Sequence, residues 1–468
     1  MVVVGAGPNG LAAAITLARA GRRVLLLEAA EQVGGGVRSA ALTLPGFVHD
    51  VCSAVYPLGA GSPFFRSLPL ARHGVDWVHP PLALAHPLDG GRVAVVARSL
   101  EQTAAGLGRD GRAYRTLVGW LAGRWGELLG GAGWRALRPG AGALLGLLRA
   151  LGSAQGVAAR RLRTSEGRAL FAGLGAHGMQ PLDRLGTAGF AMVLAAGAHA
   201  VGWPFVRGGA QRLADGLAGV LRGHGGVIRT GHPVRSLDEL PPARAILLDV
   251  SPGQLLRLAG DRLPRRYRQR LARFRRGPAA FKIDYVLEAP IPWAAEACRQ
   301  AGVVHVGGPA EEIAAAMAAA WRGPSPSRPF VLVAQPSLFD DGRVPPGSRR
   351  HTAWAYCHLP TGSTDDMTRP IEEQIERFAP GFQARIAARH VLAPAGLEAH
   401  DANLEQGDIG GGACDLRQLI FRPAPRRVPW STPDPALFLC SASTPPGPGV
   451  HGLCGHWAAR AVLRRLKG

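Results

Sequence analysis

The chain has 468 residues, of which 47% are hydrophobic and 19% are charged, a composition that excludes long disordered stretches and suits a globular protein of two domains. Its formal net charge is +21, but the basic residues are spread along the whole chain and nearly all are arginine, which argues against a dedicated nucleic-acid surface. The six cysteines form no C-x-x-C pair and no cluster typical of a metal centre, so we predict free thiols and no metal site.

The first predicted elements are a strand, a glycine turn and a helix, in "MVVVGAGPNGLAAAITLARAG". Gly5, Gly7 and Gly10 have the spacing G-x-G-x-x-G, which serves a tight turn, close approach of a pyrophosphate and close helix packing, respectively. The next strand, "RRVLLLE", ends at Glu28, 18 residues after Gly10. A carboxylate at this position accepts hydrogen bonds from a ribose diol and repels a 2′-phosphate. The sequence therefore predicts a dinucleotide-binding βαβ unit.

The region from 66 to 205 is rich in alanine, leucine and glycine, and we predict that it is mostly helical. Its longest uncharged run, residues 185–206, is long enough to span a bilayer. The glycines of this run, together with His199 and Pro204, favour a buried segment that lines a cavity instead.

The later elements alternate between two kinds of segment. Some segments resemble the N-terminal unit in their alternation of short apolar strands and helices. They are a helix near 210–222, a strand at 227–230, a strand ending near Val250, and a C-terminal strand (437–440) followed by a helix. Between them, residues 262–425 alternate strands such as "AFKIDYVLE" with helices such as "AEEIAAAMAAAW". We predict an α/β fold in which a Rossmann-type doubly wound domain (1–65, 206–261 and 426–468) is interleaved with an α+β substrate-binding domain (66–205 and 262–425).

A second glycine run, "EQVGGGVRSAAL", follows the first acidic residue. Here the chain resembles the flavoproteins that include phytoene desaturases, carotenoid isomerases and, more distantly, amine oxidases, which have G-G-R-x-x-S/T at this place. The resemblance implies that Gly34, Gly35 and Ser39 lie at the pyrophosphate of a non-covalently bound FAD. Gly36 stands where the family has arginine, and we expect Arg38 to supply the missing positive charge. NAD-dependent dehydrogenases lack this second run, which favours FAD.

The resemblance extends over nearly the whole chain and is closest to the phytoene-dehydrogenase-like branch, which also contains a mitochondrial pyridine nucleotide-disulfide oxidoreductase domain protein. In "HPVRSL", Val234 falls where the family's backbone meets the adenine. The C-terminal "STPPGPGVHGLCG" is similar to the flavin motif H-P-G-G-G-V-x-G and implies backbone N–H groups at the pyrimidine edge of the flavin. The residues that match this motif include four candidates for cofactor binding: Gly447, Gly449, Val450 and Gly452.

Flavin-dependent dehydrogenation needs few protein acids or bases, and we select two catalytic candidates. Lys282 lies in a predicted strand of a chain that otherwise uses arginine, so it is either a cavity residue that holds a water near flavin N5 or a surface lysine paired with Asp284. His451 follows the flavin motif and is expected near the isoalloxazine. Three other histidines are interpreted as structural: His177, His199 and His456.

The resemblance implies an FAD-dependent oxidoreductase that dehydrogenates an extended apolar molecule, isoprenoid- or carotenoid-like, by hydride transfer to flavin N5. Helices around residues 140–205 would line the substrate tunnel. A second nucleotide motif is missing, so oxygen or a quinone is the expected electron acceptor. Three alternatives remain: oxidation of a small amine or alcohol in a short pocket with aromatic walls, redox-neutral isomerisation, and a flavin-stabilised partner-binding protein without turnover.

The run "RLPRRYRQRLARFRR", residues 262–276, contains eight arginines and no acid. It is either a solvated helix face or a surface for anionic lipid headgroups. Because the first residues already form a strand and no signal segment precedes it, we expect a cytoplasmic protein, with peripheral contact at the inner membrane face if the run binds lipid.

Overall fold

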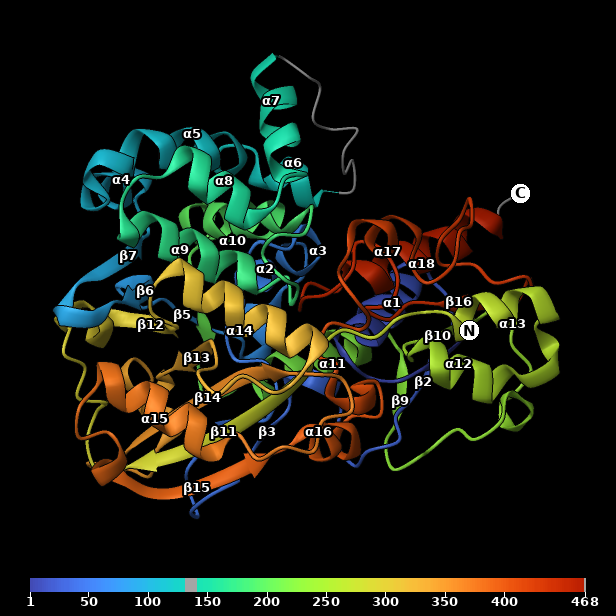
Figure 1. Cartoon of the computed structure of the whole chain (residues 1–468). Coiled ribbons are helices and arrows are strands. Elements are labelled where there is room, and N and C mark those ends of the chain that lie inside the picture. Colours follow the sequence, from blue (N-terminus) through green and yellow to red (C-terminus); the bar gives the residue numbers. More distant parts are fainter. Residues whose placement is uncertain (131–140, 467–468) are drawn as a thin grey trace.

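Two β-sheets organise the chain, as seen in a computed structural model that describes residues 1–130 and 141–466 (Figure 1). One sheet has five strands and the other has seven. A group of helices, α4 to α10, covers one side of the seven-stranded sheet, and the five-stranded sheet lies beside it together with α12 and α13 (Figure 1). The mixed α/β class predicted from the sequence is confirmed.

The five-stranded sheet is entirely parallel, in the order β16-β10-β1-β2-β9. Val3 belongs to the core under α1, α11 and α18, whereas Val2 and Val4 belong to the core under α12 and α13. This alternation follows from the two-residue period of a strand, and it shows that helices cover both faces. The strands are β1 (Val2–Val4), β2 (Leu25–Leu27), β9 (Val227–Arg229), β10 (Ile246–Leu248) and β16 (Leu437–Leu439). The helices are α1 (Pro8–Arg19), α11 (Gln211–Gly223), α12 (Pro252–Ala259), α13 (Arg265–Ala272) and α18 (Leu453–Arg465).

The seven-stranded sheet has the order β15-β11-β14-β13-β12-β6-β7, and only its β12–β6 pair is parallel. Leu84, Val303 and Leu332 pack on the helical side, and their neighbours in sequence pack toward α15 on the opposite side. The strands are β6 (Leu82–Pro87), β7 (Val93–Ala97), β11 (Ala279–Leu287), β12 (Ala301–Val306), β13 (Val331–Ala334), β14 (His351–Leu359) and β15 (Ile386–Leu392). The helices packed on this sheet include α9 (Ser165–Ala176), α14 (Ala310–Arg322) and α15 (Thr368–Phe378).

The expectation that residues 66–205 are mostly helical was wrong for their first part, which forms β5 (Trp77–Val78), β6 and β7. The runs "LALAHP" and "VAVVA" are too short to show a period; β6 pairs with β7 and also with β12, more than 200 residues later. The described residues between 100 and 200 are mainly helical, with α4 (Leu100–Gly106), α5 (Gly111–Ala122), α6 (Trp125–Leu129), α7 (Ala141–Ala150), α8 (Ala154–Arg161), α9 and α10 (Thr187–Ala200). Within the described ranges, no helix is both long and apolar enough to cross a membrane.

The remaining elements are short and connect the two sheets. They are α2 (Pro57–Ala60), α3 (Pro63–Arg66), α16 (Pro394–His400), α17 (Leu416–Phe421), β3 (Ser39–Ala40), β4 (His49–Asp50) and β8 (Phe205–Val206). Their pairings join segments that are distant in sequence, as in β5 with β8. The six cysteines, all within the described ranges, are free.

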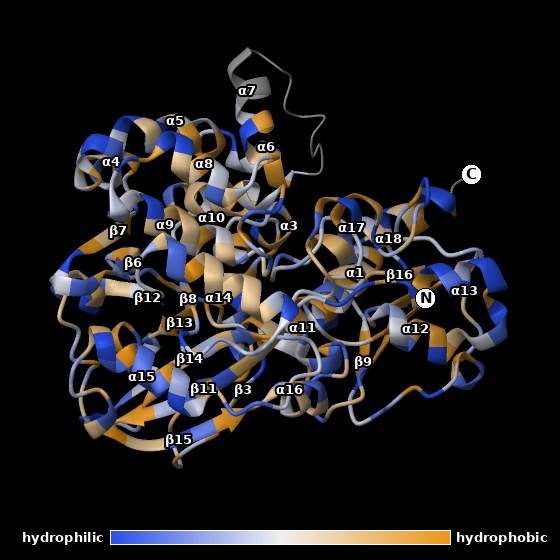
Figure 2. Ribbon diagram, viewed as in Figure 1, coloured by the Kyte–Doolittle hydropathy of each residue, from blue (hydrophilic) through white to orange (hydrophobic). Residues whose placement is uncertain are grey.

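The arginine run of residues 262–276 spans α13, which Figure 2 shows with a hydrophilic outer surface. Although the run itself contains no acid, other segments bring carboxylates to it. Four of its arginines form ion pairs: Arg262 with Asp434, Arg268 with Asp261, Arg275 with Asp415, and Arg276 with Glu405. Part of the run's charge is therefore neutralised within the fold.

Candidate functional site

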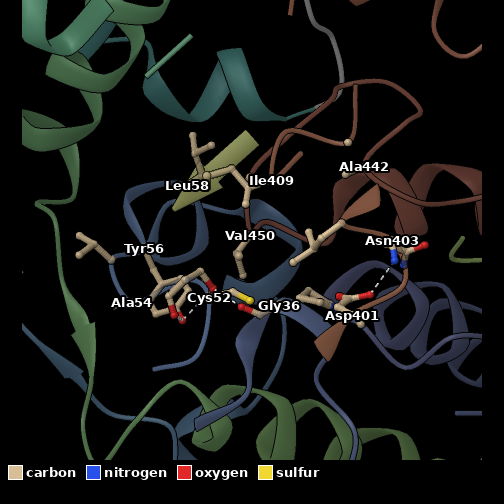
Figure 3. A pocket seen from close by; sticks show the side chains of 18 of the residues that line it. Gly36, Cys52, Ala54, Tyr56, Leu58, Asp401, Asn403, Ile409, Ala442 and Val450 are labelled. Atoms are coloured by element: carbon tan, nitrogen blue, oxygen red, sulfur yellow. Dashed lines mark hydrogen bonds between the residues drawn. The ribbon is translucent and has the colours of Figure 1, made fainter. Parts of the chain in front are cut away.

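One cavity of about 370 Å³ lies between the two large sheets, at the carboxyl ends of the parallel strands. In doubly wound sheets this edge is where ligands bind. The cavity is lined by residues from the parts of the chain that form both sheets; Figure 3 shows Gly36, Cys52, Asp401 and Val450 around its space. From the five-stranded part come Gly7, Asn9, Asp249, Ser441 and Gly449, and from the seven-stranded part come Lys282, Val303, Leu332, Trp354 and Tyr356.

The glycine turn after β1 depends on close backbone approach. Gly5 has φ of +95°, a conformation that L side chains rarely adopt. A Cβ atom at Gly10 would lie 1.9 Å from the carbonyl oxygen of Gly5. The turn therefore requires glycine at both positions, and it places the N-terminus of α1 at the cavity, where Gly7 and Asn9 are part of the wall.

Asp249, which sequence reasoning missed, lies against this turn at the end of β10. Its Oδ2 accepts a hydrogen bond of 2.7 Å from the Gly10 N–H. The pKa of Asp249 is raised to about 8, chiefly by burial and in smaller part by the nearby Asp401 and Glu28 carboxylates, whereas the hydrogen bond from the Gly10 N–H opposes the shift. The site therefore holds a carboxyl group that is mainly protonated at neutral pH. The only sequence signal was a polar residue directly after a buried strand.

Three buried polar atoms in the cavity wall lack a partner among the described residues. They are Asn9 Oδ1, in the first turn of α1, Ser441 Oγ, just after β16, and Trp354 Nε1, on β14. A buried polar atom without a partner is costly, so these atoms indicate a ligand with several hydrogen-bonding groups. The Glu28 carboxylate accepts hydrogen bonds from the backbone N–H of Ala6 (2.7 Å) and Ala30 (2.9 Å) and keeps further lone pairs for a diol. The Ser441 hydroxyl can donate to a phosphate, and Asn9 Oδ1 and Glu28 can accept from sugar hydroxyls, so these three groups fit a dinucleotide.

The second glycine run packs directly on the first. Gly34 N–H donates to the Ala6 carbonyl (2.9 Å), and a Cβ atom at Gly35 would lie 3.2 Å from the Gly7 Cα. Arg38 donates from Nε to the carbonyl of Gly35 (3.1 Å) and from Nη2 to that of His400. Its guanidinium is thus engaged with backbone oxygens and does not line the cavity.

The other predicted cofactor residues lie at different distances from the cavity. Ser39 Oγ donates to Asp50 (2.8 Å) and accepts from the N–H of Gln211 (3.1 Å), so it supports the start of α11. Val234 is in the loop after β9 and packs on the core under α12. In the C-terminal loop, Gly449 and Val450 line the cavity. Gly447 and Gly452 belong to the same loop but are not among the lining residues.

Lys282 is in the cavity wall and not on the surface. It lies on β11, is only 3% exposed, and donates from Nζ to Asp284 Oδ2. The pairing with Asp284 was expected, whereas a surface position was wrong, because β11 lies between β14 and β15 in the sheet. Burial raises the pKa of Asp284 to about 6, and the adjacent Lys282 opposes this shift. The Lys282 ammonium also lies 5.8 Å from the ring centroid of Trp354.

His451 is used within the fold. Its Nδ1 accepts a hydrogen bond of 3.0 Å from the N–H of Leu453, at the start of α18, and its carbonyl accepts one from Ser62 Oγ (2.7 Å). Burial lowers the pKa of His451 to about 4. The ring is not part of the cavity wall, so the predicted position near the isoalloxazine is replaced by a capping role at the start of α18.

Aromatic and aliphatic side chains form much of the cavity wall. The aromatic residues are Tyr56, Trp203, Trp354 and Tyr356, and the aliphatic ones include Leu194, Val303 and Leu332. From the region around 140–205, in which tunnel-lining helices were expected, the wall receives His177, Leu194 and Trp203. Residue 140 of that expected region lies outside the described residues.

Comparisons with known proteins agree with this architecture. The family described as "NAD(P)-binding Rossmann-like domain" matches residues 3–68. No curated protein matches the sequence. Among solved structures, the chain is similar to an oxidoreductase from Methanosarcina mazei, with 16% identity, 99% of both chains covered and a TM-score of 0.65.

Two further similar structures are amine oxidases by their descriptions. One is a triple mutant of putrescine oxidase, with 16% identity, 100% of this chain and 98% of that chain covered, and a TM-score of 0.62. The other is cyclohexylamine oxidase from Brevibacterium oxydans, with 14% identity, 100% and 99% covered, and a TM-score of 0.55. At these identities the likeness establishes a common fold over the whole chain.

Proposed function

We propose that the protein is an FAD-dependent oxidoreductase that oxidises a compact, mainly apolar molecule. The observation that carries this proposal is a cavity whose wall combines residues of the glycine loops, such as Gly7 and Gly449, with aromatic side chains and Lys282. When bound, the flavin supplies a two-electron acceptor at N5. The fold shared with putrescine oxidase and cyclohexylamine oxidase supports this reaction class over a binding protein without turnover.

The chain's own residues have distinct roles in this proposal. Glu28 binds the ribose diol, and the N-terminus of α1 with Ser441 binds the pyrophosphate. Lys282 Nζ uses one donor on Asp284, and its remaining N–H donors hold a water in the cavity. The aromatic and aliphatic walls position the C–H bond of the substrate and exclude bulk water.

The lining of the cavity favours a compact substrate over the extended isoprenoid expected from the sequence. Four aromatic side chains form part of its wall: Tyr56, Trp203, Trp354 and Tyr356. Aromatic walls are the feature that distinguishes oxidation of a small amine or alcohol from dehydrogenation of a long polyene.

The first test is reconstitution of the purified chain with FAD. We expect the protein to bind FAD and the Glu28→Ala variant to bind it about 10- to 100-fold more weakly, since hydrogen bonds to a charged group contribute about 1.5–3 kcal/mol. Glu31→Gln, an exposed acid near the same strand, is the matched control and should retain wild-type affinity. A chain that takes up no FAD contradicts the proposal.

The second test is anaerobic mixing of the FAD-loaded protein with three panels: primary amines, alcohols and polyene hydrocarbons. Bleaching of the flavin absorbance by an amine or alcohol supports a compact substrate. Bleaching by polyenes alone restores the isoprenoid expectation, and product without net bleaching indicates isomerisation. No response to any panel contradicts an oxidoreductase and favours a binding protein.

A further inference from the structure

Two buried histidines and a half-buried one lie in a row that ends at the cavity, which we call the histidine row: His86, His305 and His177. His86 on β6 and His305 on β12 are both fully buried, and the parallel register that pairs Ala85 with Val304 places them side by side. His177, at the end of α9, lines the cavity. Its Nε2 lies 2.9 Å from Nε2 of His305. This contact requires that one of the two rings donates and the other accepts.

The hydrogen bond of His86, at the end of the histidine row away from the cavity, determines where its own proton lies. His86 Nε2 is 2.8 Å from the carbonyl oxygen of Gly308, and a carbonyl only accepts, so His86 carries its proton on Nε2. Burial lowers the pKa of His86 to about 4, that of His177 to about 3, and that of His305 well below its usual value. All three rings are therefore neutral at neutral pH, and His86 Nδ1 is a bare acceptor.

No hydrogen bond joins His86 to His305, and a glycine of α9 packs over the Nδ1 atoms of both rings. A Cβ atom at Gly173 of α9 would lie 2.8 Å from His305 Nδ1 and 3.2 Å from His86 Nδ1, so the two nitrogen atoms are within about 6 Å of each other. Both are buried and have no partner among the described residues. A proton on His305 Nδ1 faces the lone pair of His86 favourably, whereas two bare nitrogens would repel each other in this buried place. His305 then accepts at Nε2.

We propose that His86 and His305 are positioning residues that hold His177 in the tautomer with a proton on Nε2 and a bare Nδ1, so that the cavity offers a hydrogen-bond acceptor to an N–H or O–H group of the substrate. His177, interpreted as structural from the sequence, thereby becomes a specificity residue. The inference rests on the proposed function only in that the cavity holds the substrate. In the described part of the chain, no group of these histidines with acids or cysteines forms a metal-binding set.

Nitrogen NMR of the protein with ¹⁵N-labelled histidine measures the tautomers of the histidine row and needs neither turnover nor a known substrate. We expect the Nε2–H tautomer for His177 and His86, and the Nδ1–H tautomer for His305, with signals assigned by single substitutions. A proton on His177 Nδ1, or a charged ring among the three at neutral pH, overturns the proposal. This measurement does not depend on FAD. A wrong prediction of the histidine tautomers is therefore distinguishable from a wrong proposal of oxidoreductase activity.

Substitution of His86 tests whether this residue influences the tautomer of His177. In His86→Leu, we expect His177 to become a mixture of tautomers although it is not itself changed. The matched control is His199→Leu. His199 is hydrogen-bonded to Tyr114 and is not part of the histidine row, so this substitution should leave the tautomer of His177 unchanged. If His86→Leu does not fold, Gly173→Ala is the second variant, because its Cβ would displace His305 and His86.

Ligand preference is measured with benzyl alcohol and benzyl methyl ether, which differ in one donor. The wild-type protein should bind the alcohol about 3- to 10-fold more tightly, the range expected for one net hydrogen bond. The preference should become smaller in His86→Leu, because only part of the protein then has a bare His177 Nδ1, and it should persist in His199→Leu. Equal affinity of the wild-type protein for the two compounds, or no binding of either, removes the acceptor role of His177.

Discussion

At the scale of single residues, Lys282 and Asp249 bring ionisable groups into the cavity from opposite ends. Lys282 is held by Asp284 on the same strand, and Asp249 is held by the Gly10 N–H at the start of α1. Each group is buried, so its protonation depends on its few neighbours and not on bulk solvent. These two residues are where small changes should have measurable chemical effects.

Replacement of Lys282 by methionine tests the water-holding role. Methionine preserves most of the side-chain volume but removes every N–H donor, so we expect reoxidation of the reduced, FAD-loaded protein by oxygen to slow by about 100-fold, the scale of loss from a misplaced reacting group. Stopped-flow absorbance measures this rate after reduction with dithionite. The FAD content per chain is the control and should be unchanged. Wild-type reoxidation in the variant would return Lys282 to a structural role.

Asp249 should make the stability of the cofactor-free protein depend on pH. Its pKa is about 8 in the native state and near 3.8 in the unfolded chain, so between pH 4 and 8 the native state holds a proton that the unfolded state releases. Stability should therefore fall as pH rises through this window, by at most about 1.4 kcal/mol per pH unit from this group. Denaturant unfolding at pH 5 to 8 should show a weaker fall for Asp249→Asn. The exposed Asp183→Asn variant should match the wild type.

At the scale of elements, α1 and α18 cross with almost no space between their backbones. Both helices pack on the same face of the five-stranded sheet, and α18 begins directly after the C-terminal glycine loop. A Cβ atom at Gly455 would lie 1.7 Å from the carbonyl oxygen of Asn9. The first and last helices of the chain are thus joined next to the predicted cofactor loops, and one glycine permits their approach.

Gly455→Ala should therefore disturb both stability and cofactor binding. We expect a loss of about 1–3 kcal/mol in the free energy of unfolding, the usual effect of added volume in a packed contact, together with weaker FAD binding. Gly223→Ala, at the exposed end of α11, meets no atom within 4 Å and is the control. It should be neutral or stabilising by up to about 1 kcal/mol. Equal behaviour of the two variants would contradict the close contact seen here.

At the scale of the whole molecule, a fully buried ion-pair network ties the interleaved segments together. Arg343 donates to Asp50 (2.8 Å), to Asp340 (2.8 Å) and to the carbonyl of Val206 (2.9 Å). Asp50 belongs to the N-terminal segment, and Val206 lies where the chain returns to the five-stranded part. Both carboxylates would be left without their cation if Arg343 were removed.

Arg343→Met should accordingly destabilise the whole chain by about 3–5 kcal/mol, the cost of leaving a buried charge unpaired. Arg350→Met is the matched control, because the Arg350–Glu288 pair is exposed and such pairs contribute about 0–1 kcal/mol. Thermal or denaturant unfolding measures both. A small effect at Arg343 would show that the network is not needed to hold the segments together.

The amino-acid sequence by itself determined the features that depend on local chemistry. The glycine turn, Glu28 at the end of β2, α11 with β9, and the C-terminal strand and helix were all predicted close to their observed positions. These elements have strong signals, because glycine spacing and short apolar strands constrain the backbone within a few residues. The pairing of Lys282 with Asp284 was also accessible, since the two residues are two positions apart on one strand.

Only the tertiary structure decided what depends on contacts between distant segments. Strands β6 and β7 are too short to show a period; β7 pairs with β6, and β6 joins the seven-stranded sheet only through its pairing with the distant β12. Asp249 meets Gly10 across 239 residues, and His177 meets His305 across 128. Their pKa shifts and hydrogen bonds arise from burial against those partners, which no local pattern encodes. The cavity wall is assembled in the same way, so the glycine turns could be predicted from the sequence, whereas the aromatic and charged residues that share the cavity with them could not.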